Sequence, residues 1–371
     1  MSTRLWTRLL IAGSALGHRL AGGARRKPAV PQRILVIAPL FAGDALLLTP
    51  LLAKLRQRFP DCTLYLIAGR AVQALYQHRP YGVQAGVFDP RDAATLRALQ
   101  RWPAADLAIA AGESRYSWLA LALGARWIVG FGGERRRLQN WALDEAIAPP
   151  ERAVAWGDMA AMLVSGPPAS PYAAADWPDP AFVPFELPPS PYCLLHVEAS
   201  SPLKQWEDAK WLALAEGLAA GGMTVVWSAG PGGRDLIKRI DPAGRFVSLG
   251  WQLDLAQLWH LVKRAALLAS VDTSVGHIGK LTGTPTLVLF GPGSAGLYGT
   301  GDFWRNSPWR AATEPDFHCR DRQILFKREI PWIRRCDRQP GQCRAPRCMH
   351  AIGVDAVRAQ LDQLFPMRES A

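Results

Sequence analysis

The chain has 371 residues, of which 49% are hydrophobic and 20% charged, a composition typical of a globular protein and unlike that of a disordered chain. Its length favours two domains of about 150 residues each. The sequence has no uncharged apolar run of about 18 residues, so no membrane-spanning helix is predicted. The net charge of +12 is unevenly distributed along the chain. Residues 1–43 carry seven basic residues and no acid, and residues 318–347 carry nine against three, so the basic character belongs to two local patches.

Residues 1–31 form a basic N-terminal segment with Leu5, Trp6, Leu9, Leu10 and Leu20 among the arginines. Two interpretations are open: a basic amphipathic segment that lies on an anionic membrane surface, or a disordered basic tail. A cleaved signal peptide is disfavoured because the apolar stretch 9–16 is short and interrupted.

An apolar run at 34–38 predicts the first strand, and a polar turn follows it. Six apolar side chains then recur at helical spacing, which predicts one amphipathic helix: Leu47, Leu48, Leu51, Leu52, Leu55 and Phe59. Asp44 lies in the first turn of this helix. Its carboxylate can cap the helix, or, being ionised at neutral pH and placed at a strand end, it can act as a general base.

The chain divides at residues 166–191, where nine prolines predict an interdomain linker. The expected domains are 32–165 and 192–350, and residues 351–371 form a last segment. Each half opens with an apolar strand, at 34–38 and 192–197, and then alternates helical and extended runs. This alternation predicts α/β domains with parallel sheets of the Rossmann type, whose ligands bind beyond the carboxyl ends of the strands.

The second half has two polar turns that follow strands. Residues 196–206 offer the hydroxyls of Ser200 and Ser201 and the ammonium group of Lys204, which suits a phosphate oxygen. The strand 224–228 leads into a glycine-rich turn with Gly230 and Gly232, followed by Asp235. Such a turn lets a ligand approach the backbone, although a lone glycine turn is a weak signal.

Residues 267–292 read as a strand, a polar turn, a helix and a second strand. Thr273 or Ser274 can cap the helix, and Gly283 and Pro285 end it. The first amides of a helix have no intrahelical partner, and the helix dipole favours negative charge there. The turn from 273 to 277 therefore predicts a site for a phosphate or diphosphate.

These motifs, in this order, resemble glycosyltransferase family 9, the heptosyltransferase family of lipopolysaccharide core assembly. The resemblance runs from about residue 33 to the C-terminus. It rests on four stretches: Gly43-Asp44 with Leu47, Thr49 and Pro50; residues 196–206; Asp272-Thr273 with His277; and residues 283–292.

The resemblance implies a GT-B architecture, two Rossmann-like doubly wound domains facing across a cleft, with an inverting and metal-independent transfer. Asp44 matches the proposed catalytic base. The implied donor site is Ser200, Ser201, Lys204, Asp272, Thr273, Ser274, Gly276 and His277, with Gly230, Gly232 and Asp235 as weaker members. The acceptor side falls on Gly43, Glu113, Arg115, Arg135 and Arg136. The last helix, about 354–364, is expected to pack across the domain interface.

The resemblance also implies the partners. The donor is a nucleotide sugar, most readily ADP-heptose, and the acceptor is an anionic glycolipid presented at the inner face of the cytoplasmic membrane, so a cytoplasmic, peripherally associated enzyme without a cofactor is expected. The chain departs from the pattern at two points. The polar residue expected directly after the strand 107–110 is missing, and Asp235 is an uncertain counterpart of the ribose-binding acid.

Two features near the C-terminus leave alternatives open. Cys336, Cys343 and Cys348, with Cys319 and His350 nearby, lack the paired spacing of a zinc site, so reduced cysteines are favoured over a metal. Three tryptophans, at 304, 309 and 332, lie among basic residues, which suits a phosphorylated glycolipid or a nucleic acid. The absence of a nucleic-acid motif favours the glycolipid.

Three other functions compete with the heptosyltransferase interpretation. One is transfer from another nucleotide sugar, for a surface polysaccharide. The second is a non-catalytic protein that binds glycolipid through its basic patches. The third is a nucleotide-dependent oxidoreductase, which is weakened because no G-x-G-x-x-G follows the first strand.

Overall fold

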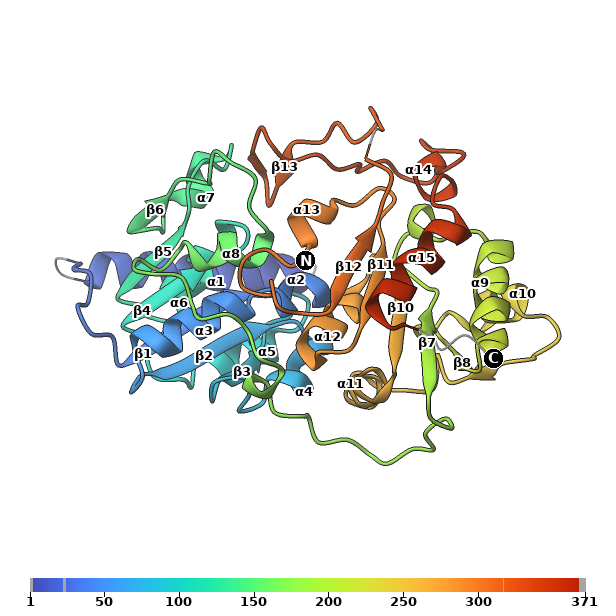
Figure 1. Cartoon of the computed structure of the whole chain (residues 1–371). Helices are drawn as coiled ribbons and strands as arrows, with labels where there is room; N and C mark the ends of the chain where they lie inside the picture. The colour runs from blue at the N-terminus through green and yellow to red at the C-terminus, as the bar shows by residue number, and fades with distance from the viewer. Residues whose placement is uncertain (1–2, 23–24, 316, 367–371) are drawn as a thin grey trace. The chain divides into compact units, whose positions relative to one another are not determined.

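The structure is a computed structural model that describes residues 3–22, 25–315 and 317–366. The chain forms two compact units, coloured by residue number in Figure 1. Unit 1 comprises Met1–Ser170 and Gln323–Trp332, and unit 2 comprises Pro171–Arg322 and Ile333–Ala371. Parts of the expected first and last segments, residues 1–2, 23–24 and 367–371, lie outside the described residues.

Unit 1 is built on a six-stranded parallel sheet in the order β3-β2-β1-β4-β5-β6. Its strands are β1 (Arg33–Ala38), β2 (Thr63–Ala68), β3 (Gln84–Val87), β4 (Leu107–Ala110), β5 (Trp127–Phe131) and β6 (Glu145–Ile147). The central strands β1 and β4 are almost wholly buried, as expected of parallel strands covered on both faces.

Helices cover this sheet: α1 (Thr3–Ala21), α2 (Ala42–Leu46), α3 (Thr49–Arg58), η1 (Arg70–Val72), α4 (Gln73–Tyr76), α5 (Ala93–Leu99), α6 (Arg115–Ala122), α7 (Arg137–Asn140) and α8 (Trp156–Ala161). Within the basic N-terminal segment, Thr3–Ala21 form the helix α1. α1 packs on α6, with Ala15 fully buried and the Ser14 hydroxyl donating to the Ala122 carbonyl at 3.0 Å.

The single helix predicted after β1 is wrong, because the structure has two helices there. α2 ends at Leu46 and α3 begins at Thr49, with Pro50 in its first turn. Proline has no amide hydrogen to continue the α2 ladder and is well suited to the first turn of a new helix. The Thr49 hydroxyl donates to the Leu46 carbonyl at 2.7 Å and fixes the break.

A hairpin from late in the chain also belongs to unit 1. Its strands are β13 (Ile324–Leu325) and β14 (Arg328–Glu329), paired antiparallel. Phe326 and Lys327 form the turn with φ angles of 44° and 67°, the left-handed region that a two-residue hairpin turn requires. The expected donor domain, 192–350, contains this segment, whereas the structure groups it with unit 1.

Unit 2 repeats the architecture, with the order β12-β11-β10-β7-β8-β9. Its strands are β7 (Tyr192–His196), β8 (Thr224–Ser228), β9 (Val247–Ser248), β10 (Leu267–Val271), β11 (Thr286–Leu289) and β12 (Trp309–Ala312). Its helices are η2 (Ala174–Asp176), η3 (Pro202–Lys204), α9 (Asp208–Ala220), α10 (Arg234–Ile240), α11 (Leu255–Arg264), α12 (Ser274–Thr282), α13 (Ala295–Tyr298), α14 (Arg347–His350) and α15 (Val354–Leu364). The last helix buries Val357 and Leu361 in the core of this unit.

The α/β prediction with two Rossmann-like units is confirmed, since each sheet has the doubly wound 3-2-1-4-5-6 order when its strands are counted within the unit. In such a sheet the chain winds in opposite directions from a central pair of strands. That pair is β1 and β4 in unit 1, and β7 and β10 in unit 2. The carboxyl ends of these pairs are where a ligand is expected.

No helix among the described residues is long and apolar enough to cross a membrane.

Candidate functional site

The turn after β10, where the sequence predicts an anion site, leads into α12. Thr273 is the N-cap, and its hydroxyl accepts from the Val275 amide at 3.1 Å, as predicted. Ser274 is half-buried in the first turn. Because the first amides of a helix lack intrahelical acceptors and carry the positive end of its dipole, this turn attracts an anion.

Lys204 brings an ammonium group to the same turn, where it pairs with Asp272. Its Nζ lies 2.7 Å from Asp272 Oδ2 and donates to the Asp272 carbonyl at 3.2 Å. Asp272 is buried and Lys204 is half-buried, so the ion pair holds the ammonium group beside the helix N-terminus while part of it faces solvent. The structure therefore brings Lys204 to the turn that contains Asp272 and Thr273, although Lys204 and Asp272 are 68 residues apart in sequence.

His277 lies in the first turn of α12 but adds no charge to it. Burial, together with the positive charges of Lys280 and Lys204, holds the pKa of His277 well below its usual range. A neutral imidazole can donate or accept one hydrogen bond at each nitrogen. Its Nδ1 has no hydrogen-bond partner among the described residues.

Two other predicted donor residues have local structural explanations. The Ser201 hydroxyl caps η3 by accepting from the Leu203 amide at 3.3 Å, whereas Ser200 is exposed. Gly276 allows α12 to pack on β11, since an added Cβ would lie 2.5 Å from Val288 Cγ2. The glycine is therefore required for packing, whatever its part in binding.

The glycine turn after β8 has a neighbour that sequence reasoning missed. Glu198, two residues beyond β7, lies against Gly230, Gly232 and Gly233, where an added Cβ would lie 2.7–3.4 Å from its carboxylate oxygens. The predicted Asp235 is instead exposed in the first turn of α10. A glutamate in a polar loop gives no sequence signal, because only the pairing of β7 with β8 brings it to the turn.

On unit 1, Asp44 is the third residue of α2, and Phe41 is the N-cap residue. The N-cap interpretation of Asp44 is therefore wrong. Trp156 Nε1 donates to the Asp44 carbonyl at 3.3 Å, and the Trp156 ring lies 4.7 Å from that of Phe326 in the hairpin turn. Trp156 thus holds the backbone of Asp44, and Phe326 of the hairpin packs on Trp156 in turn.

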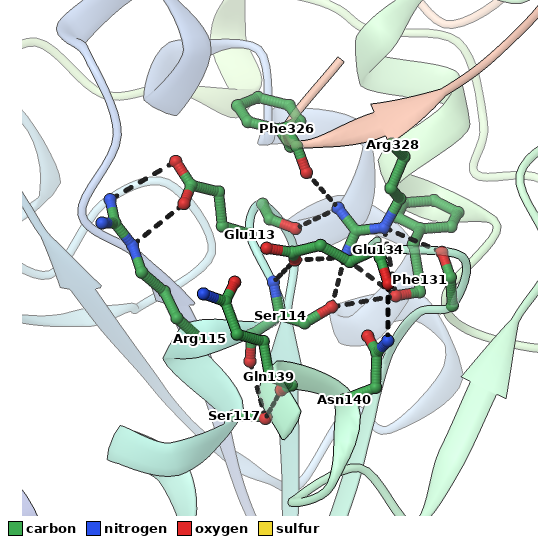
Figure 2. A network of polar contacts seen from close by, with 12 residues as sticks. Glu113, Ser114, Arg115, Ser117, Phe131, Glu134, Gln139, Asn140, Phe326 and Arg328 are labelled. Atoms are coloured by element: carbon green, nitrogen blue, oxygen red, sulfur yellow. Dashed lines mark hydrogen bonds and ion pairs between the residues drawn. The ribbon is translucent and has the colours of Figure 1, made fainter. Parts of the chain in front are cut away.

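Figure 2 shows a polar network beyond the ends of β4 and β5, with Arg328 at its centre. The guanidinium donates to the Phe131, Gly132 and Gly112 carbonyls at 2.8–2.9 Å and to the Ser114 hydroxyl at 2.6 Å. It also lies 3.6 Å from Glu134 Oε2, which accepts from the Ser114 amide at 2.7 Å. Arg328 and Glu134 are 2% and 4% exposed.

Sequence reasoning missed all three residues of this network, Ser114, Glu134 and Arg328. A polar residue was expected directly after β4 and is missing there; the buried Ser114 hydroxyl lies four residues beyond the end of the strand. Nothing in the sequence marks Arg328 among the other arginines of residues 318–347, since its partners lie about 200 residues away.

Three of the predicted acceptor-side residues, Glu113, Arg115 and Arg135, lie next in sequence to members of this network. Arg115 pairs with Glu113 at 3.0 Å, and Arg135 pairs with Glu329 of the hairpin at 3.1 Å. Arg136, next to Arg135, is exposed at the start of α7, and Gly43 is half-buried in α2. The result is a polar surface beyond β4 and β5 with exposed arginines, suited to a ligand that carries negative charge.

The predicted surface of tryptophans among basic residues is wrong. Trp304 and Trp309 are buried around Lys280, whose Nζ donates to the Tyr298 and Gly299 carbonyls and lies 4.3 Å from the Trp309 ring centroid. Trp332 Nε1 donates to the Pro150 carbonyl at 2.7 Å. These rings hold the structure together and are not available as a platform for a glycolipid or a nucleic acid.

The six cysteines are all free. In the part of the chain that the structure describes, no three His, Cys, Asp or Glu side chains form a group that could hold a metal ion.

Comparisons with known proteins point to one family. Residues 95–322, more than half of the chain, match the family model described as glycosyltransferase family 9 (heptosyltransferase). Lipopolysaccharide heptosyltransferase 1 of Pseudomonas aeruginosa is 28% identical over 179 residues, 48% of this chain and 49% of the relative. Lipopolysaccharide heptosyltransferase 3 of Escherichia coli is 29% identical over 123 residues, 32% of this chain and 34% of the relative.

The matched stretches thus span about half of the first relative and a third of the second. The solved structure of an E. coli heptosyltransferase with ADP-2-deoxy-2-fluoro heptose has a TM-score of 0.66 at 17% identity, covering 89% of this chain and 99% of that one. At this identity the likeness shows the fold.

Proposed function

The chain belongs to glycosyltransferase family 9, and from this membership we propose that it is an inverting glycosyltransferase that moves a heptose from ADP-heptose onto a lipopolysaccharide core acceptor. The observation that carries the proposal is the cationic turn of unit 2, where Lys204 and the N-terminus of α12 meet at the carboxyl ends of β7 and β10. The names of the two relatives and the ligand of the solved heptosyltransferase support the sugar and the nucleotide.

In the proposed mechanism Asp44 accepts the proton of the acceptor hydroxyl, and the oxygen attacks the anomeric carbon of the donor. The bond between that carbon and the diphosphate oxygen breaks, and the configuration inverts. The diphosphate leaves with an added negative charge, which Lys204 and the first amides of α12 stabilise. The transition state has oxocarbenium character, as in other displacements at a sugar carbon.

Release of the nucleotide from the donor, together with the mass of the product, tests the proposal directly. Purified protein is given ADP-, UDP- and GDP-sugars with truncated core glycolipids, and nucleotide release is followed. Transfer from ADP-heptose is expected. Transfer only from a UDP- or GDP-sugar would assign the chain to another glycosyl transfer, and no transfer with any pair would leave a glycolipid-binding protein.

The general base is tested by Asp44→Asn and Asp44→Ala. We expect the turnover number to fall roughly 10²–10⁴-fold, the range of general acid–base catalysis, while donor affinity changes little because the donor is held by unit 2. Asp158→Asn, another acidic residue in the first turn of a unit 1 helix, is the matched control and should retain turnover. Retained turnover in both Asp44 variants would remove this residue from the mechanism.

We also propose that the protein works at the inner face of the cytoplasmic membrane, where a lipid-linked acceptor is presented. α1 supports this. It buries Ala15 against unit 1, while six apolar side chains are exposed: Leu5, Trp6, Leu9, Leu10, Leu16 and Leu20. Arg4 and Arg8 are exposed on the same helix, and neither pairs with a carboxylate of the described residues. An apolar stripe with a basic edge suits the surface of an anionic bilayer.

A further inference from the structure

Three consecutive carbonyls of α2 each accept a hydrogen bond from a buried side chain of another helix. The three pairs are Trp156 Nε1 to the Asp44 carbonyl at 3.3 Å, the Tyr76 hydroxyl to the Ala45 carbonyl at 2.6 Å, and the Thr49 hydroxyl to the Leu46 carbonyl at 2.7 Å. The three donor side chains are fully buried and come from α8, α4 and α3, all in unit 1. Together, Thr49, Tyr76 and Trp156 form a carbonyl clamp.

The carbonyl clamp matters because α2 has only five residues. A helix this short is not stable alone, since forming one turn fixes several residues for a single hydrogen bond. Its N-cap residue, Phe41, gives the first amides no side-chain hydrogen bond, although such a cap would stabilise the start of the helix. The side chains of Ala45 and Leu46 are buried, but apolar packing has no preferred direction. Hydrogen bonds do have a preferred distance and angle, so the carbonyl clamp fixes the orientation of α2.

We infer that the carbonyl clamp positions the carboxylate of Asp44 for proton transfer, an inference that rests on the proposed role of Asp44 as the general base. Two of its members bond to the carbonyls of Asp44 and of the next residue, so a shift of either moves the backbone that carries the carboxylate. A general base must lie within hydrogen-bond distance of the proton that it accepts, and a displacement of about 1 Å can slow a reaction roughly 100-fold. The members of the clamp are therefore positioning residues, which act through Asp44.

Tyr76→Phe tests the inference by removing a single hydroxyl. The ring stays, and the Ala45 carbonyl keeps its bond from the Leu48 amide at 3.0 Å, so the variant is expected to fold. Turnover is measured with the nucleotide sugar and the truncated core glycolipid that the wild type uses best. We expect kcat to fall roughly 10-fold, while the KM values of donor and acceptor change little. Thr49→Val removes another hydroxyl of the clamp at similar volume and should show the same split between kcat and KM.

Tyr192→Phe is the matched control, because it loses the same kind of bond in unit 2. The Tyr192 hydroxyl donates to the Leu261 carbonyl at 2.6 Å, and its side chain is buried at the amino end of β7. That end of the sheet is opposite to the one where a ligand is expected. Both Phe variants should lower the midpoint of thermal unfolding by a similar amount, but Tyr192→Phe should keep the wild-type kcat. A merely structural role of Tyr76 would give the two variants the same kcat.

The double variant Asp44→Asn/Tyr76→Phe shows whether the hydroxyl acts through the base. Once the base is absent its position no longer matters, so this variant should have the same kcat as Asp44→Asn. A hydroxyl that supports the site in another way would lower kcat again in the Asp44→Asn background.

The inference alone is overturned if Asp44→Asn lowers kcat while Tyr76→Phe does not. It is also overturned if Tyr192→Phe loses as much kcat as Tyr76→Phe, or if the two losses multiply in the double variant. Wild-type kcat in Asp44→Asn would remove the base and the inference together. A wild type that transfers no sugar overturns the proposed function, so these failures are distinguishable.

Discussion

His196 and His277 are two buried histidines of unit 2, one at the end of β7 and the other in α12, and both are held neutral. Burial lowers the pKa of His196 to about 4, and its Nδ1 lies 3.0 Å from the Ser228 hydroxyl. The pKa of His277 is lowered by burial and by two lysines. Each imidazole is therefore a neutral hydrogen-bonding group in the folded protein.

This neutrality predicts a loss of stability in mild acid. Below the ordinary histidine pKa of about 6.5, the unfolded chain binds protons that the folded chain excludes, so the free energy of unfolding falls by about 1.4 kcal/mol per pH unit for each histidine. For His196 the fall continues until the pH reaches about 4. Urea unfolding of wild type and His196→Gln between pH 7.5 and 5 gives, for each protein, the slope of the free energy of unfolding against pH.

The His196→Gln slope should be shallower, even though the variant is less stable at every pH. The exposed His350 provides the control, because His350→Gln should keep the wild-type slope. Equal slopes for wild type and His196→Gln would contradict the interpretation.

Among the elements, the β13–β14 hairpin depends on one buried arginine. Arg328 satisfies three backbone carbonyls and the Ser114 hydroxyl, and it is the cation beside the buried Glu134. Removing one partner of a buried ion pair leaves the other charge uncompensated, which costs about 3–5 kcal/mol. Phe326 and Glu329 also contact the rest of unit 1, but Arg328 is the buried ion-pair partner, and its loss leaves polar groups unsatisfied on that side of the contact.

Arg328→Met is expected to lower the free energy of unfolding of unit 1 by about 3–5 kcal/mol, measured by urea unfolding. Adding Glu134→Gln should recover part of this loss, because the two changes act on one pair. Glu329→Gln is the matched control in the same hairpin. Its pair with Arg135 is exposed, so the change should stay within about 1 kcal/mol. A similar effect of Arg328→Met and Glu329→Gln would refute this account.

Local signals in the sequence were sufficient for most elements. The Thr273 cap, the Gly283 end of α12 and the alternation of strands and helices all depend on neighbours in sequence, and the structure has them. The break between α2 and α3 was missed because the apolar spacing continues through it. The Arg328 network and the position of Glu198 depend on strands that pair across long separations, so no local pattern reveals them.

At the scale of the whole molecule, the charge of +12 is concentrated in two parts of the chain, and α1 has six of the thirteen exposed large apolar side chains among the described residues. Flotation with vesicles tests its proposed membrane contact. Wild type should bind vesicles that contain phosphatidylglycerol better than phosphatidylcholine alone, and binding should weaken as salt screens the arginines.

The double variant Leu9→Ser/Leu16→Ser should bind the anionic vesicles several-fold less, since both side chains lie on the exposed stripe of α1. Leu138→Ser/Val183→Ser removes two apolar side chains elsewhere that are more exposed than Leu9 and Leu16, and this variant should bind like wild type. Equal binding by the two double variants, or a dimer that only the α1 variant disrupts, would contradict the proposal.

The return of residues 323–332 to unit 1 means that the chain passes between the two units three times, after Ser170, Arg322 and Trp332. Neither unit is a continuous stretch of the gene. A fragment cut at residue 170 would lack Arg328 and leave Glu134 buried without its cation. Transfer of the whole of unit 1 into a related chain therefore needs two segments, with the hairpin transferred alongside the first 170 residues.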